Sequence, residues 1–136
     1  MALLELSSIS PHEERNRIVR ILNYKRNEET NYTLYVIQVH LGDFTWTVER
    51  RFRDFAEFDS KRFKDQKRSF LPPKKLVGNS DPNFLTERRS ELEKYLRTVV
   101  ELEMWLQKKR EGFAMPRLLA RFLDFHQYVS HILKTD

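Results

Sequence analysis

Positive charge is concentrated in one stretch of this chain, residues 50–75, and the chemistry that such a stretch can do is to bind an anion. It holds ten Lys or Arg against four Asp or Glu, a net charge of +6, whereas the whole chain of 136 residues carries only +5. A local field of this kind attracts anions. The chain is therefore basic at one place and not throughout.

Arg50, Arg51 and Phe52 form the first candidate group. The two arginines end a predicted strand at the entry to a helix, and guanidinium groups hold phosphates well. The N-terminus of a helix adds backbone N–H donors and a favourable dipole. The ring of Phe52 could form an apolar wall for the C–H face of a sugar or cyclitol. Alternatively, Arg51 is a solvated strand residue and Phe52 belongs to the core.

Lys74 and Lys75 directly follow two prolines, which favour an extended polyproline course. Their ammonium groups could reach the same anion, or they are solvated loop lysines. The next residues, Leu76 and Val77, are apolar within a predicted loop. If exposed, they would form a small wedge for a lipid headgroup layer; otherwise they pack under the loop.

Arg88 interrupts the apolar stripe of a predicted helix. At about 100° per residue it lies between Leu85 and Leu92, where a leucine would be expected. A guanidinium at such a position needs a partner, either a buried carboxylate or a bound anion. In the first case Arg88 pairs with an acid such as Glu91 or reaches out to solvent. In the second case it belongs to the anion site.

The elements that must position these residues begin with three strands. Strands are predicted over residues 17–24, 32–41 and 44–51, with a polar loop at 25–31. Gly42-Asp43 is a two-residue hairpin turn between the second and third strands. Together these segments predict an antiparallel meander.

Helical spacing follows the strands. Phe52, Phe55 and Phe58 recur every third residue, and no helix breaker occurs before Ser69. An irregular stretch containing the two prolines then leads to the next helix.

The second half of the chain is predicted to be helical. Asp81 is the expected N-cap of a helix that begins at Pro82 and runs to about residue 103. Another helical segment ends near residue 112, and a last one begins at Pro116 and carries apolar residues as far as residue 133. Strands before helices predict the α+β class.

The chain lacks the residues that several classes of function need. Cysteine is absent, the three glycines form no phosphate-binding loop, and the four histidines show no metal-ligand spacing. No nucleophile or acid–base group has a recognisable setting. We therefore expect no enzyme, no cofactor and no metal site. The basic stretch alone would permit nucleic-acid binding, but no such motif occurs, so no nucleic-acid partner is expected.

The protein is expected to be cytoplasmic. No apolar run approaches the roughly 20 residues that a membrane span needs. The first residues, MALLEL, lack the basic lead and cleavage pattern of a signal peptide.

Three groups in a fixed order resemble a phox-homology (PX) domain. They are RRF (50–52), LPPKK (71–75), and the ER (87–88) within FLTERRSELEKYL (84–96). The resemblance covers residues 17–130 and leaves 1–16 as a flexible lead and 131–136 as a tail. It implies an α+β PX fold, in which a three-stranded antiparallel β-meander packs against three to four helices with a proline-rich loop.

The resemblance also implies roles for single residues. In the family, the second arginine of the R-R-[YF] motif binds the 3-phosphate of a phosphatidylinositol, and here it is Arg51. The next aromatic residue, Phe52, walls the inositol ring. The lysine after the prolines, Lys74, grips the 1-phosphate. The arginine early in the second long helix, Arg88, bonds the ring hydroxyls.

Three further residues are secondary candidates for the same site: Arg50, Lys75 and Arg89. The implied function is a phosphoinositide-binding membrane-targeting module, which recognises phosphatidylinositol 3-phosphate on early or recycling endosomes as part of a larger scaffold or sorting protein. The alternative is a protein–protein interaction module with weak or no lipid binding, which gains support if Lys74 or Arg88 is held by internal partners.

Overall fold

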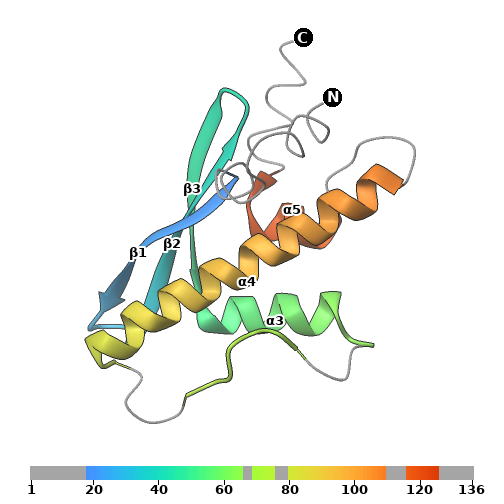
Figure 1. Cartoon of the computed structure of the whole chain (residues 1–136). Coiled ribbons are helices and arrows are strands. Elements are labelled where there is room, and N and C mark those ends of the chain that lie inside the picture. The colour runs from blue at the N-terminus through green and yellow to red at the C-terminus, as the bar shows by residue number, and fades with distance from the viewer. Residues whose placement is uncertain (1–17, 66–68, 76–79, 110–115, 126–136) are drawn as a thin grey trace.

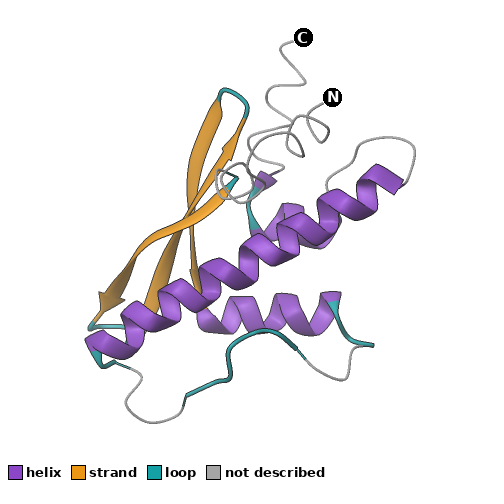
Figure 2. Cartoon of the chain, viewed as in Figure 1, coloured by secondary structure: helices purple, strands orange, loops and turns teal. Residues whose placement is uncertain are grey.

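Three antiparallel strands and the helices beside them make up the part of the chain that is described. The computed structural model describes residues 18–65, 69–75, 80–109 and 116–125. The strands are β1 (Val19–Asn27), β2 (Tyr32–Leu41) and β3 (Phe44–Arg51), in the spatial order β1-β2-β3. Figure 2 shows these strands in one layer, with the helices beside it. The predicted α+β class with a three-stranded antiparallel meander is confirmed.

The strands β2 and β3 have the predicted bounds. Their turn places Gly42 at φ +58°, a conformation that glycine adopts without the steric penalty of a side chain. Alternation along β3 buries Trp46 and Val48 on the face that meets the helices. The same alternation sends Arg51 to the opposite face from Trp46.

β1 is longer than the sequence predicted, because residues 25–27 belong to the strand and not to the loop. Arg26 pairs with Thr33, and Asn27 pairs with Tyr32. The Asn27 side chain then closes a short turn by accepting the Glu29 N–H at 2.9 Å. The predicted loop is wrong at residues 25–27, because backbone pairing does not require apolar side chains and polar composition alone does not indicate a loop.

The helices are α3 (Phe52–Arg62), α4 (Pro82–Lys109) and α5 (Arg117–Phe122). α3 ends at Arg62, well before the predicted limit at Ser69. The backbone of Phe63 leaves the helical region (φ −117°, ψ 35°), and its ring packs edge-on against Phe70 at 5.5 Å between centroids. A contact between segments, which no local pattern signals, therefore accompanies the end of this helix.

α4 is one continuous helix, whereas the sequence predicts two segments with a boundary near Glu103. Glu103 is only 4% exposed and accepts a hydrogen bond from Arg62 Nε at 2.9 Å. A charged residue can thus lie inside the helical stripe because a cation on α3 neutralises it. The predicted start at Pro82 is correct, and the Asn83 N–H lies 3.3 Å from Asp81 Oδ1.

α5 begins after Pro116, as predicted, but it ends at Phe122. Asp124 has φ +53°, which a continuing helix does not allow. The remaining positions of the predicted last helix, beyond Phe125, lie outside the described residues. Trp46 on β3 donates its indole N–H to the Leu123 carbonyl at 2.8 Å, which ties the end of α5 to the sheet.

The helices α3 and α4 pack side by side and run in the same direction (Figure 1). Phe52 at the start of α3 lies under Arg88 of α4. Further along, the Tyr95 hydroxyl donates to Asp59 Oδ1 at 2.8 Å in a buried site. Because contacts follow one another in the same order along both helices, both helix N-termini lie at one end of the pair.

Polar side chains of α4 cover the free edge of β1. Arg89 Nη1 donates to the Ile21 carbonyl at 2.6 Å, and the Ile21 N–H donates to Glu93 Oε1 at 2.8 Å. Arg97 Nε donates to the Val19 carbonyl at 3.2 Å. An uncovered edge strand offers its backbone to other chains, so these bonds both protect β1 and fix α4 against it. Within the described residues, no helix is long and apolar enough to cross a membrane.

Replacing Tyr95 by Phe is expected to lower the free energy of unfolding by about 1–3 kcal/mol, because the buried Asp59 carboxylate loses a donor. Urea titration of the variant measures the change. Tyr24→Phe is the matched control, since Tyr24 is half-buried and its hydroxyl has no hydrogen-bond partner among the described residues. Equal stability of the two variants would contradict a stabilising role for the Tyr95–Asp59 bond.

Candidate functional site

A cleft of about 520 Å³ opens where the starts of α3 and α4, the turn between β1 and β2, and the proline loop (residues 69–75) come together. Six cationic side chains line it, and no Asp or Glu is among its described lining residues. These six are Arg26, Arg51, Arg53, Lys74, Lys75 and Arg88. The cleft therefore has the size of a small-ligand site and the charge of an anion site.

The four main candidates from the sequence all line this cleft: Arg51, Phe52, Lys74 and Arg88. They come from the end of β3, the start of α3, the proline loop and α4, so residues distant in the sequence meet at one place. Lys75, a secondary candidate, lines the cleft as well. Leu76 and Val77 lie outside the described residues.

Arg88 is buried inside the cleft wall, with 4% of its surface exposed. Its guanidinium lies over the ring of Phe52 at 4.2 Å and over the ring of Phe84 at 4.8 Å. Arg88 Nη2 donates to the Pro73 carbonyl at 2.6 Å, which holds the proline loop against α4. Stacking and this single bond fix the orientation of the side chain.

The charge of Arg88 is incompletely compensated. Its Nε is buried without a hydrogen-bond partner, and no carboxylate of the described residues lies within ion-pair distance of it. Glu91, the acid proposed from the sequence as a partner, forms no such pair. Burial lowers the pKa of Arg88 from its ordinary value, and Tyr35 and Glu91 oppose this shift. An unsatisfied buried donor is energetically unfavourable, so this feature points to a ligand that completes the site.

Arg51 is held by its backbone and by an aromatic ring. Its N–H donates to Asp54 Oδ2 at 2.9 Å, which caps the start of α3. Its guanidinium lies over the ring of Tyr32 at 4.2 Å. This stacking leaves the edge of the guanidinium, where all its N–H donors lie, available to an anion.

Arg51 and Arg88 each have a neighbouring arginine, Arg50 and Arg89, and both neighbours point away from the cleft. Arg50 Nη2 bonds Asp124 Oδ1 at 3.0 Å and lies near the end of α5. Arg89 bonds the Ile21 carbonyl and pairs with Glu93 at 3.7 Å. Neither lines the cleft, so these two secondary candidates have structural partners and are not part of the site that we describe.

Two helix N-termini contribute to the field in the cleft. α3 and α4 begin beside it, and Phe52 and Phe84 from their first turns line it. The N-terminus of a helix carries a partial positive charge and free backbone N–H groups. The parallel packing of the two helices thus adds to the positive potential of the side chains.

Sequence reasoning missed Arg26, Tyr32, Tyr35 and Phe84, which also line the cleft. Arg26 had been assigned to a loop with the rest of residues 25–31. The sequence carried no signal for Arg26, because it lies between the polar residues Lys25 and Asn27, and only the structure shows that it is half-buried. Tyr32 and Tyr35 carried no signal of a site, since both fit an ordinary strand.

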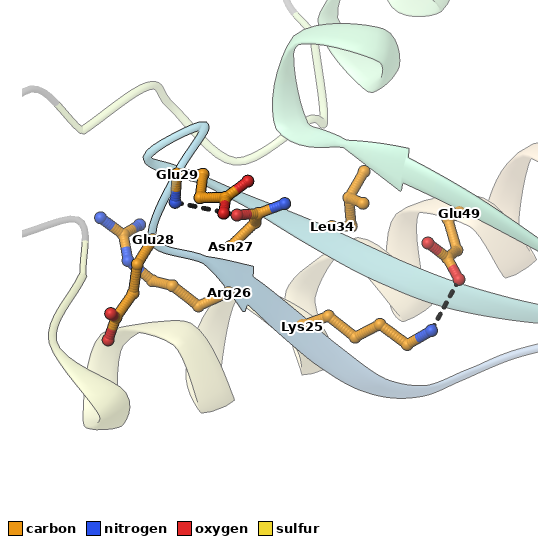
Figure 3. Close-up of a pocket in the computed structure, with 7 residues that line it drawn as sticks. All are labelled: Lys25, Arg26, Asn27, Glu28, Glu29, Leu34 and Glu49. Atoms are coloured by element: carbon orange, nitrogen blue, oxygen red, sulfur yellow. Dashed lines mark hydrogen bonds and ion pairs between the residues drawn. The ribbon is translucent and has the colours of Figure 1, made fainter.

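A second hollow of about 570 Å³ lies beside the β1–β2 turn and has a different character. Its two cations, Lys25 and Arg26, face three glutamates. Figure 3 shows the Lys25 ammonium paired with Glu49, at 2.8 Å. Because the charges are mixed and partly neutralised, this hollow is not suited to binding a phosphate.

Comparison with known proteins identifies the class of this fold and site. Residues 38–126 match the PX domain family, and the chain belongs to that family. PX domains are phosphoinositide-binding modules of larger proteins that associate with membrane surfaces, and the fold itself is not enzymatic.

Individual relatives agree with this assignment. The kinesin-like protein KIF16B of Homo sapiens is 41% identical over 66 residues, which are 46% of this chain and 5% of that protein. The PX domain-containing protein kinase-like protein of Rattus norvegicus is 31% identical over 101 residues, which are 72% and 16% of the two chains. The X-ray structure of a designed CISK-PX domain is 27% identical, with a TM-score of 0.60, and covers 77% of this chain and 96% of its own. The chain thus spans only a small part of the curated relatives.

Replacing Arg88 by Met should separate stability from binding. A long apolar side chain removes the buried charge and its unsatisfied donor, which is favourable, but it also removes the bond to the Pro73 carbonyl. Because these effects oppose each other, we expect the free energy of unfolding to change by no more than about 1 kcal/mol. Binding of a phosphoinositide should be lost. Urea titration and vesicle sedimentation measure the two effects.

Arg89→Met is the contrasting variant. It removes the bond to the Ile21 carbonyl, so it should destabilise the fold. If Arg88→Met were the more destabilised of the two, Arg88 would be mainly a structural residue.

The stability of the fold should fall at alkaline pH, in part through Tyr35. Burial raises the pKa of Tyr35 from 10.0 to about 12. A raised pKa means that the folded state keeps the phenol proton longer than the unfolded state, so stability is lost as pH rises from about 10 to 12. The pKa of Tyr95 is also raised, mainly by burial, and acts in the same direction.

Tyr35→Phe should therefore make the stability curve shallower between pH 10 and 12. Chemical denaturation at a series of pH values measures the slope. An unchanged slope would show that the Tyr35 phenol ionises equally easily in the folded and unfolded states.

Proposed function

We propose that the cleft binds the headgroup of phosphatidylinositol 3-phosphate and so holds the protein on endosomal membranes. One observation carries this proposal. Arg88 is buried with an unpartnered Nε in a cleft that also contains Arg51 and Lys74 and no described carboxylate. An anion that also offers hydroxyl groups would satisfy all three side chains at once.

The roles of the residues follow the resemblance to the family. Arg51 binds the 3-phosphate, and Lys74 binds the 1-phosphate that links the inositol to the lipid. Arg88 donates to ring hydroxyls, and Phe52 provides the apolar wall. Stacking of Arg88 on Phe52 supports this arrangement, because it fixes the guanidinium and the wall relative to each other before the ligand arrives.

The strength of such a site can be bounded. Charge-assisted hydrogen bonds contribute about 1.5–3 kcal/mol each. Three or four of them make a micromolar headgroup site, about −8 kcal/mol, reasonable. Exposed lysines near an anionic leaflet would add about 1 kcal/mol each.

Membrane association would be peripheral, and the proline loop would face the lipid. Lys74 and Lys75 are exposed on this loop. Leu76 and Val77 follow them directly and would enter the headgroup layer. The localisation that we propose is therefore cytoplasmic, on early or recycling endosomes.

The chain would act as one part of a larger scaffold or sorting protein. Its curated relatives are much longer than the matched region. Within the family, the segments YVIQV and WTV, LPPKK, and PRLLARFLDFHQY (116–128) are similar to the amino-terminal PX domain of nischarin. We propose a nischarin-like scaffold on this basis.

Arg51→Gln tests the proposal. We expect the affinity for vesicles that contain phosphatidylinositol 3-phosphate to fall by about 10- to 100-fold, the equivalent of one lost charge-assisted contact. Sedimentation or surface plasmon resonance measures binding. Arg20→Gln is the matched control, because Arg20 is exposed on β1 and does not line the cleft.

Binding of the wild-type chain should be saturable and selective. Equal binding to every acidic vesicle would argue for a diffuse electrostatic surface and against a stereospecific pocket. No lipid binding at all would favour the alternative, a protein-interaction module in which the bond from Arg88 to Pro73 has only a structural role.

A further inference from the structure

We infer that the cleft has a second subsite for a phosphate monoester on the inositol ring, and that Arg26 is the residue that binds it. This inference rests on the proposed function, because it concerns the same ligand. It goes further in naming the ligand class: a ring with a second phosphate monoester beside the one assigned to Arg51.

The position of Arg26 is the first argument. Arg26 lies near the end of β1 and pairs with Thr33 of β2, while the neighbouring Leu34 pairs with Arg51 of β3. Arg26 and Arg51 therefore lie at the same end of the sheet, on the two strands that flank β2. Both line the cleft.

The partners of Arg26 are the second argument. Its Nη2 donates to Asn31 Oδ1 at 2.7 Å, and its Nη1 is 3.3 Å from Thr33 Oγ1. Both acceptors are neutral, and no described carboxylate forms an ion pair with this guanidinium. A guanidinium has five N–H donors, so two bonds leave three of them for a ligand. The side chain is thus fixed in place while its charge stays uncompensated.

Residues 31–33 contact both Arg26 and Arg51. Asn31 and Thr33 flank Tyr32, and the guanidinium of Arg51 lies over the Tyr32 ring at 4.2 Å. Arg26 and Arg51 are consequently oriented by one rigid piece of chain. Figure 3 shows the Arg26 side chain extending away from the Lys25–Glu49 pair, on the side of Glu28, and no ion pair joins Arg26 to Glu28.

Charge balance is the third argument. The headgroup of a 3-monophosphate carries about three negative charges, roughly two on the monoester and one on the diester. Arg51, Lys74 and Arg88 match these three charges. Arg53 does not need a ligand for compensation, because it is 71% exposed and paired with Glu57 at 3.7 Å. Two cations of the cleft remain, Lys75, whose ammonium lies over the Phe84 ring at 4.3 Å, and Arg26, and both add positive charge that the 3-monophosphate leaves unmatched.

Either a membrane lipid or a soluble inositol phosphate could supply this ring. Both present the same chemistry, two phosphate monoesters on one cyclitol. The experiment therefore needs a soluble arm and a vesicle arm.

Isothermal titration of the full 136-residue chain with soluble headgroups tests the subsite. The probes are inositol 1,3-bisphosphate, inositol 1,3,4-trisphosphate and inositol 1,3,5-trisphosphate. We expect one of the trisphosphates to bind about tenfold more tightly than the bisphosphate, as one added charge-assisted contact predicts. In Arg26→Gln this ratio should fall to about one, although both affinities decrease because the cleft loses a charge.

Arg20→Gln is the matched control, since it removes the same charge from β1 away from the cleft and should leave the ratio unchanged. A wild-type ratio near one for both trisphosphates would overturn the inference. So would an Arg26→Gln variant that weakens all three ligands by the same factor, because Arg26 would then only support the turn.

The vesicle arm compares the 3-monophosphate lipid with the 3,4- and 3,5-bisphosphate lipids at equal total surface charge. The same preference in both arms supports a lipid ligand, and a preference in the soluble arm alone supports a soluble inositol phosphate.

Arg51→Gln separates this inference from the proposed function. If Arg51→Gln keeps full affinity for every probe, the proposed function fails; if it loses affinity while the ratio in the wild type is one, only the second subsite fails.

Discussion

The parallel packing of α3 on α4 is the constraint on which the rest of this structure depends. Arg88 stacks on Phe52 at one end of the pair, Tyr95 bonds Asp59 in the middle, and Arg62 bonds Glu103 at the other end. These contacts fix the axial register of the two helices. As a result both N-termini, with their partial positive charges, lie beside one cleft. A shift of either helix along the other would separate the residues that line it.

Like charges converge in the cleft, whereas the other buried charges of the described fold have ion-pair or hydrogen-bond partners. Elsewhere in the described part of the chain, buried or half-buried charges have partners, as the Arg62–Glu103 pair and the cluster around Glu93 show. In the cleft, cations converge without a described carboxylate, and Arg88 keeps an unsatisfied Nε. Binding sites commonly hold such strain, which a ligand relieves. The hydrophobic core and the β1 edge contacts supply the stability that tolerates it.

The two Arg-Arg pairs show how local geometry assigns different tasks to neighbouring residues. Arg50 shares the face of Trp46 on β3 and reaches Asp124 at the end of α5, whereas Arg51 stands at the junction of β3 with α3 and lines the cleft. The turn of about 100° per residue in α4 sends Arg88 to the cleft and Arg89 to the edge of β1. One arginine of each pair therefore faces the candidate ligand, and the other holds together the elements that form the site.

The sequence by itself determined the fold class, the bounds of β2 and β3, the start of α4 and the misplaced charge at Arg88, because each of these depends on periodicity, turn chemistry or capping within a few residues. The resemblance to the family added which arginine of each pair belongs to the cleft.

Only the tertiary structure decided the end of α3, the continuity of α4 through Glu103 and the place of Arg26 and Tyr32 beside Arg51. Each of these depends on partners far away in the chain: Phe70 for α3, Arg62 for Glu103, and β2 for Arg26. A local pattern carries no information about such partners, because burial and charge compensation are set by whichever segments the fold brings together.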